Sequence, residues 1–178
     1  MKTLLQIIND KKHKEVISIA PNRPVFDALV ILAEYKIGAL AVMQDGKLVG
    51  IFSERDYARE VILQGRSSKT TQISEVMTIK VISGNPDDLV DKAMALMSEK
   101  NIRHLPVMDG DKMIGMLSIG DLVKETIAYQ QRLIAELESY IKGYTVGAAC
   151  SRDMFSARLF AAASRSYKLL QLLANNFH

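Results

Sequence analysis

The sequence is poor in residues that crosslink or anchor a chain, with one cysteine, no tryptophan and four prolines among 178 residues. The single cysteine, Cys150, excludes an intrachain disulfide and a zinc site built from several cysteines, which indicates a reducing compartment. No apolar run reaches the roughly 20 residues that cross a bilayer, and polar residues interrupt the N-terminal segment too early for a secretory signal. With 48% hydrophobic residues, we expect a soluble, globular, cytoplasmic protein.

Several catalytic motifs are also missing. There is no Gly-x-x-x-x-Gly-Lys-Ser/Thr loop, no Gly-x-Gly-x-x-Gly, no His-Glu-x-x-His and no Gly-x-Ser-x-Gly. The sequence therefore predicts no enzyme activity, no catalytic cofactor and no metal site.

Charge is distributed unevenly along the chain. Residues 144–178 contain four basic side chains and one acidic side chain, which leaves 19 basic and 19 acidic side chains in residues 1–143. Because this larger part has no net charge, it lacks the positive field that favours binding to nucleic acid. We therefore expect no nucleic acid partner.

The chain contains the same unit twice. Residues 37–57 align without a gap on residues 102–122 at an offset of 65, and residues 16–18 match residues 81–83 at the same offset. Eight pairs in the longer alignment are identical: Ile37/Ile102, Leu40/Leu105, Val42/Val107, Met43/Met108, Lys47/Lys112, Gly50/Gly115, Ser53/Ser118 and Asp56/Asp121. Two copies of a repeat usually pack on each other and create a site between them.

Each copy predicts the order strand, helix, strand, strand, helix. The apolar residues after the first strand have the spacing of one buried helical face, namely Val25, Ala28, Leu29 and Leu32, with counterparts Val90, Ala93, Met94 and Met97. Two apolar runs then flank an Asp-Gly turn at 45–46 and again at 109–110, which predicts hairpins. Helices should follow over about 56–63 and from 121 to beyond 128. We expect a first repeat with an N-terminal lead segment over 1–66, a second repeat over 67–128 and a helical extension over 129–178.

The motif Gly-x-x-Ser-x-x-Asp occurs in both copies where the hairpin meets the following helix, at 50–56 and 115–121. One interpretation is a helix cap, in which Ser and Asp satisfy free backbone N–H groups reciprocally. The other is a nucleotide pocket, because helix N-terminal N–H groups attract phosphate and a carboxylate accepts hydrogen bonds from ribose hydroxyls. The occurrence at equivalent junctions of a tandem repeat favours the nucleotide pocket.

With the repeated Ile-x-x-Leu-x-Val-Met run and the hairpin, this motif makes residues 16–127 resemble the tandem cystathionine-β-synthase (CBS) domain pair, or Bateman module. The Ser-Glu-Arg-Asp form of the first copy is similar to small stand-alone bacterial modules. The resemblance implies an α+β fold in which two β-α-β-β-α repeats pack about a pseudo-twofold axis, here with a C-terminal helical extension. It also implies two clefts that bind AMP, ADP, ATP, NAD(H) or S-adenosylmethionine, a homodimer, and regulation of a partner protein whose identity the sequence does not give.

Carried over position by position, the resemblance implies nine ligand-binding residues. It places Asp56 and Asp121 at the ribose, Ser53 and Ser118 near the phosphate, and Arg103 and His104 near phosphates, whereas Ala20 and Ala39 border the adenine. Arg55 is the ninth residue. Because Arg55 can hold phosphate and its counterpart Gly120 cannot, the clefts should differ. The similarity of the Ser-Glu-Arg-Asp form to stand-alone modules implies that the first cleft is the stronger site. His104 has a second interpretation, as a buried, hydrogen-bonded histidine.

Two further hypotheses concern the C-terminal part. In the first, the chain is a homo-oligomeric assembly protein with vestigial clefts, and its interface contains Leu122, Ile127, Leu133, Ile134, Leu137 and Ile141. In the second, residues 154–173 form a basic amphipathic helix that packs back on the domain or contacts an anionic membrane. We regard the membrane role as the less favoured of these two.

Overall fold

The computed structural model describes residues 1–11 and 15–144. The chain divides into one unit over Met1–Arg132 and a second that begins at Leu133. The first unit is α+β, as expected, and contains both repeats. Cys150 and the amphipathic segment 154–173 lie outside the described residues.

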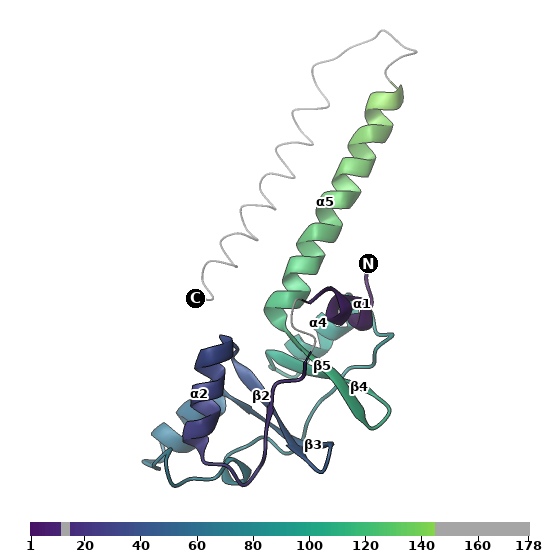
Figure 1. Ribbon diagram of the computed structural model, residues 1–178. Helices are drawn as coiled ribbons and strands as arrows, with labels where there is room; N and C mark the ends of the chain where they lie inside the picture. Colours follow the sequence, from purple (N-terminus) through teal and green to yellow (C-terminus); the bar gives the residue numbers. More distant parts are fainter. Residues whose placement is uncertain (12–14, 145–178) are drawn as a thin grey trace. The chain divides into compact units, whose positions relative to one another are not determined.

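The first repeat contains a three-stranded sheet and the helix α2 (Figure 1). Its elements are β1 (Ser18–Ile19), α2 (Val25–Tyr35), β2 (Ala39–Gln44) and β3 (Lys47–Ser53). Strand β1 pairs in parallel with β2, which forms an antiparallel hairpin with β3. Asp45 and Gly46 adopt φ angles of 50° and 77°, the left-handed region that a tight hairpin turn requires, so the predicted turn is confirmed.

The second repeat contains α4 (Val90–Glu99), β4 (His104–Asp109) and β5 (Lys112–Ser118). The strand expected at 81–83 is reduced to a single parallel bridge between Gly84 and Val107. In the first repeat the backbone N–H of Ala41 donates to the carbonyl oxygen of Ile17 at 3.4 Å. The corresponding residue of the second repeat is Pro106, which has no N–H to donate, so the strand shortens.

Helical residues follow each hairpin two residues earlier than predicted. After β3, α3 (Glu54–Asp56) continues as a π-helical segment, η1 (Tyr57–Ile62). After β5, α5 runs from Ile119 to Tyr144. Both start immediately after the serine of the repeated motif, because that serine is the N-cap in the first copy and occupies the same position in the second.

Each repeat completes its core with a short segment that lies N-terminal to the aligned part of the other repeat, which begins at residue 16 in the first and at residue 81 in the second. The short helix α1 (Leu4–Asp10) buries Leu4, Ile7 and Ile8 among core residues of the second repeat. The 3₁₀ turn η2 (Ile73–Glu75) places Ile73 and Val76 in the core of the first repeat. The lead segment that we grouped with the first repeat therefore packs on the second, and this exchange ties the two repeats into one unit.

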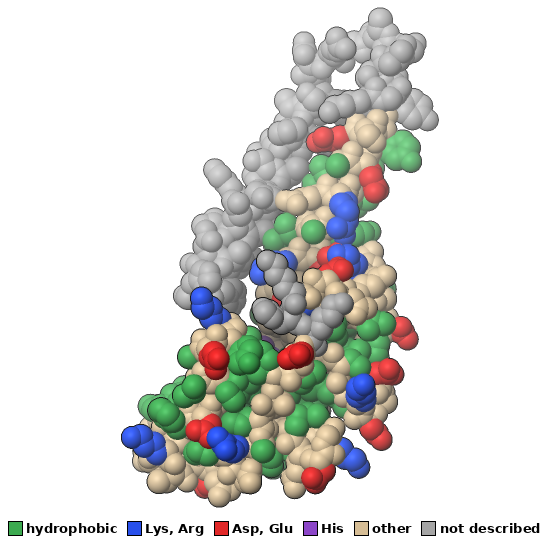
Figure 2. Space-filling view, viewed as in Figure 1, with side chains coloured by type: hydrophobic (Ala, Val, Ile, Leu, Met, Phe, Trp, Pro, Cys, Tyr) green, Lys and Arg blue, Asp and Glu red, His purple; other side chains and the backbone are tan. Residues whose placement is uncertain are grey.

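Helix α5 changes character along its length. Leu122 is fully buried, so it belongs to the core and not to an exposed interface. Residues 130–141 are exposed throughout, including five large apolar side chains: Leu133, Ile134, Leu137, Tyr140 and Ile141. Figure 2 shows hydrophobic side chains beside charged ones on this part of the helix. No helix among the described residues is long and apolar enough to cross a membrane.

Candidate functional site

The repeated Ser-x-x-Asp motif forms a capping box in the first copy and the same hydrogen bonds in the second. Ser53 donates from its backbone N (2.9 Å) and its Oγ (2.6 Å) to Oδ2 of Asp56, and Asp56 N donates back to Ser53 Oγ at 3.3 Å. Ser118 and Asp121 repeat the arrangement at 2.8, 2.8 and 3.2 Å. Both aspartates are therefore fixed at a helix start. The cap interpretation is confirmed, and each capped aspartate also lines a cleft.

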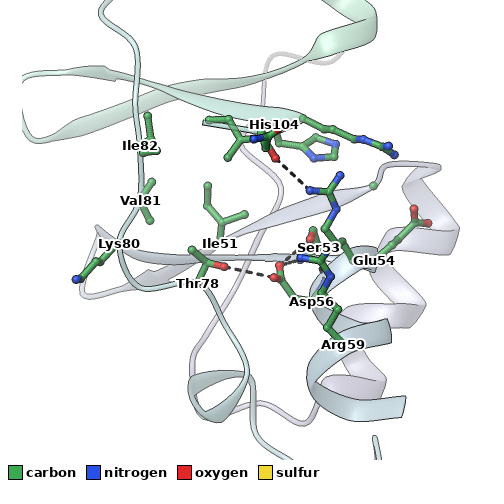
Figure 3. A pocket seen from close by; sticks show the side chains of 15 residues that line it. Ile51, Ser53, Glu54, Asp56, Arg59, Thr78, Lys80, Val81, Ile82 and His104 are labelled. Atoms are coloured by element: carbon green, nitrogen blue, oxygen red, sulfur yellow. Dashed lines mark hydrogen bonds between the residues drawn. The ribbon is translucent and has the colours of Figure 1, made fainter. Parts of the chain in front are cut away.

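The first cleft, here called the Asp56 cleft, has a volume of about 290 Å³ (Figure 3). From the first repeat it is lined by Gly38, Ile51, Ser53, Glu54, Arg55, Asp56 and Arg59, and from the second by Thr78, Lys80, Val81, Ile82, Asn101, Ile102, Arg103 and His104. The volume is at the lower end of small-molecule sites, which run from about 300 Å³ upward. Because both repeats supply its walls, a ligand in this cleft would contact both repeats at once.

Positive charge dominates the Asp56 cleft. Its lining contains four basic side chains, Arg55, Arg59, Lys80 and Arg103, against two carboxylates, Glu54 and Asp56. The Arg55 guanidinium donates to the carbonyl oxygen of Asn101 at 3.1 Å and so spans the cleft between the repeats. A confined, net positive site beside a helix start favours an anionic ligand group.

Thr78 is a cleft residue that the sequence analysis missed. Its Oγ1 donates to Oδ1 of Asp56 at 3.3 Å, and its backbone pairs with Ile51 through hydrogen bonds of 2.8 and 3.0 Å. Thr78, Lys80, Val81 and Ile82 come from the extended segment before α4 (Figure 3). The repeat alignment stops at residue 81 on this side, so no repeated motif marked the positions before it.

The second cleft, here called the Asp121 cleft, reverses the roles of the repeats. It is larger, at about 680 Å³, and its lining includes Ser118 and Asp121 of the second repeat and Val16, Ile17 and Ala39 of the first. Lys11 enters this cleft, and its Nζ lies 2.8 Å from Oδ2 of Asp121. Burial by itself raises the pKa of Asp121, but hydrogen bonds from Lys11 and Ser118 outweigh it and hold that pKa below its usual value. Asp121 therefore carries its charge and already has a cationic partner.

His104 and Gly38 line both clefts. A Cβ atom on Gly38 would lie 3.2 Å from Cε1 of His104, so the missing side chain makes room for the imidazole. Burial lowers the pKa of His104, Asp121 opposes that effect, and Lys11, Arg103 and Arg55 add to it. The ring is therefore neutral at pH 7 and stands between the two clefts.

Most of the nine predicted residues line one of the two clefts, but residues from both repeats lie together in the same cleft. Ser53, Arg55 and Asp56 share their cleft with Arg103 and His104, so basic residues of both repeats lie in the same cleft. Ala39, Ser118 and Asp121 line the other cleft. Ala20 is exposed and lies outside both linings. Within the described ranges no group of three or more His, Cys, Asp or Glu side chains could hold a metal ion.

The family model and the related proteins that match this chain all point to the same family. The sequence family described as CBS domain matches residues 9–63 and 73–127. The CBS domain-containing protein CBSX3, mitochondrial, of Arabidopsis thaliana is 42% identical over 124 residues, which are 67% of this chain and 60% of that protein. The CBS domain-containing protein YhcV of Bacillus subtilis (strain 168) is 33% identical over 115 residues, which are 65% of this chain and 81% of that protein. No catalytic family is indicated by these matches.

Solved structures match the same region. A protein with CBS domains from Burkholderia ambifaria MC40-6 has a TM-score of 0.69 at 48% identity and covers 71% of this chain and 95% of that chain. The CBS domain pair of protein MJ0100, in complex with 5′-methylthioadenosine and S-adenosyl-L-methionine, has a TM-score of 0.65 at 27% identity, with 72% and 98% covered. The chain therefore belongs to the CBS-domain family, with two copies of the domain in tandem.

Proposed function

We propose that this protein binds an adenine nucleotide in the Asp56 cleft and acts as a non-catalytic regulatory sensor. The observation that carries the proposal is one cleft between the repeats that combines a fixed carboxylate, Asp56, with an excess of basic side chains. A carboxylate suits ribose hydroxyls and basic side chains suit phosphates. The MJ0100 domain pair, which binds two adenosine compounds, supports the class of ligand.

Each wall of the Asp56 cleft suits one part of such a ligand. Asp56 would accept hydrogen bonds from the ribose, and it already faces the cleft with both carboxylate oxygens held in place. Arg55 and Arg103 would meet the phosphates of AMP, ADP, ATP or NAD(H). The apolar side chains of Ile51, Val81 and Ile82 form a separate part of the lining that suits the flat face of adenine (Figure 3).

A signal would arise because the ligand joins the two repeats. The free chain already links them through Arg55 and the carbonyl of Asn101. A nucleotide that replaces this contact binds one arrangement of the repeats better than another and shifts the population between them. The changed surface would act on a partner protein, and the homodimer and the cytoplasmic location remain predictions.

Titration calorimetry with AMP, ADP, ATP, NAD, NADH and S-adenosylmethionine tests this proposal. Asp56→Asn should weaken binding of the tightest ligand by about tenfold or more, because hydrogen bonds to a charged group contribute about 1.5–3 kcal/mol. Arg55→Gln should weaken ATP more than AMP, because the lost charge acts on the phosphates. Lys92→Gln is the matched control, since Lys92 lies on α4 and pairs with Asp88 outside both clefts. Absence of binding by every compound would contradict the proposal.

A second candidate function is homo-oligomeric assembly, and the exposed face of α5 favours it. Leu133, Ile134, Leu137 and Ile141 recur at helical spacing and are each at least 43% exposed. An isolated helix segment of this length is marginal in water, so a second copy of α5 that covers these side chains would stabilise it. Light scattering should then report a dimer that Leu137→Glu dissociates, whereas Glu138→Gln leaves it intact. A monomeric unmodified chain would contradict this function.

A further inference from the structure

His104 lies on a wall that the two clefts share. Its side chain lines both clefts, and Figure 3 shows it on the side of the Asp56 cleft opposite Ser53 and Glu54. Within residues 1–11 and 15–144, no hydrogen bond engages the imidazole ring. The same residues contain no buried side-chain nitrogen or oxygen atom that lacks a partner, so the ring nitrogens reach the surface of a cleft. The nitrogens of this ring are therefore available to a ligand.

Burial and charge keep the ring neutral in the free chain. Five charged side chains surround it: Glu54 and Arg55 of α3, Arg103 before β4, Asp121 of α5 and Lys11 after α1. The attraction of Asp121 is reduced because Lys11 Nζ lies 2.8 Å from its carboxylate. Glu54 stands across Gly38, where an added Cβ atom would be 3.5 Å from Glu54 Oε2 and 3.3 Å from His104 Nε2. Burial and the three cations together hold the pKa of His104 below its usual value.

An anionic ligand group in the Asp56 cleft reverses this balance. Arg55 and Arg103, which we assign to the phosphates, are two of the three cations that act on the ring. A phosphate between them offsets their charge and brings a hydrogen-bond acceptor to the same cleft. An imidazolium donates from both nitrogens, and a hydrogen bond from a charged donor to an anion is roughly twice as strong as a neutral one. The complex therefore favours the protonated ring that the free chain disfavours.

We propose that His104 couples ligand binding to proton uptake: its imidazole takes a proton from solvent when an anionic group enters the Asp56 cleft, and holds that group as an imidazolium. This rests on the proposed nucleotide-binding function. Because the complex then carries one more proton than the free chain, affinity rises as the pH falls. The dependence ends above the pH at which the ring is neutral in the complex as well.

Calorimetric titration with NAD tests this coupling. The phosphates of NAD exchange no proton near neutral pH, unlike a monophosphate such as AMP, whose second pKa lies near about 6. As the pH falls from about 7.5 to about 6, affinity of the unmodified chain for NAD should rise about threefold or more. Titrations in buffers of different ionisation enthalpy should show net proton uptake. His104→Gln should lose most of both effects. Lys36→Gln is the matched control and should keep both, because Lys36, with Glu34, lines the Asp121 cleft and not the Asp56 cleft.

Nitrogen NMR of the imidazole follows the proton directly on the unmodified chain. The His104→Gln variant serves only to assign the signal among the three histidines. At about pH 6.5 the ring should be neutral in the free chain and charged in the NAD complex. If AMP binds and NAD does not, the same comparison is made with AMP, whose own proton contributes equally to both chains and cancels in the difference.

The possible failures can be told apart. A ring that stays neutral in the complex, or one already charged in the free chain, would overturn the coupling and leave nucleotide binding intact. Equal proton uptake by the unmodified chain and His104→Gln would do the same. Absence of binding of both NAD and AMP would overturn the proposed function and, with it, this inference.

Discussion

The contribution of α1 to the second repeat can be measured with one core substitution. Leu4 is fully buried, and its Cδ1 lies 2.8 Å from where a Cβ atom on Gly84 would sit. Leu4→Ala removes three carbon atoms, whose transfer to water costs about 0.8 kcal/mol each, or about 2.4 kcal/mol. The cavity left behind adds to this, so we expect a loss of about 3–4 kcal/mol in the free energy of unfolding.

Urea unfolding followed by far-UV circular dichroism is the assay. With a slope of about 2 kcal/mol per molar urea, the midpoint should fall by about 1.5–2 M. Leu5→Ala is the matched control on the same helix. Leu5 is 39% exposed, and its substitution by Ala changes the helix propensity by the same amount as Leu4→Ala does. Equal midpoints for Leu4→Ala and Leu5→Ala would refute the conclusion that α1 belongs to the core.

A double-mutant cycle with Gly84 sharpens this test. Gly84→Ala alone should destabilise, because its new methyl group would lie 2.8 Å from Leu4 and 3.1 Å from Leu105. In the Leu4→Ala background the closer of these contacts is gone and the methyl group partly fills the cavity. The two substitutions should therefore be non-additive, with a favourable coupling of about 1 kcal/mol or more. Additive effects would mean that α1 does not pack against Gly84.

The repeated elements could be predicted from sequence because their signals are local. The Asp45-Gly46 turn, the buried face of α2 and the capping serines each depend on residues within a few positions of one another. The shortened strand before α4 was also predictable in principle, since Pro106 stands where the first repeat needs a backbone donor. Similarity of side chains between the repeats does not reveal which backbone groups can donate a hydrogen bond.

The exchange of lead segments and the composition of the clefts were not accessible in this way. Arg103 lines the cleft of Asp56 because the repeats face each other with their roles reversed, which is a tertiary relation. Thr78 and Lys11 lie beyond the aligned repeat, so no counterpart marked them. Ala20 was assigned by analogy alone, and the chain there runs along the exposed surface.

Two further predictions concern buried titratable groups. Glu125→Gln should lower the free energy of unfolding by about 1–2 kcal/mol in urea titrations. The reason is that the Glu125 side chain is 9% exposed and pairs with both Lys2 and Arg132, which remain partly solvated. An unchanged urea midpoint would contradict a stabilising role for these two ion pairs. For His104, burial holds the pKa below its usual value, so the folded chain resists protonation that the unfolded chain accepts near about pH 6.5. The full contribution of His104 to stability should therefore be present well above that pH and fall as the pH drops through about 6.5 and below, since the unfolded state binds the extra proton. His104→Gln should remove most of this loss, whereas an undiminished pH dependence in His104→Gln would mean that the imidazole between the clefts is not the group that takes up the proton on unfolding.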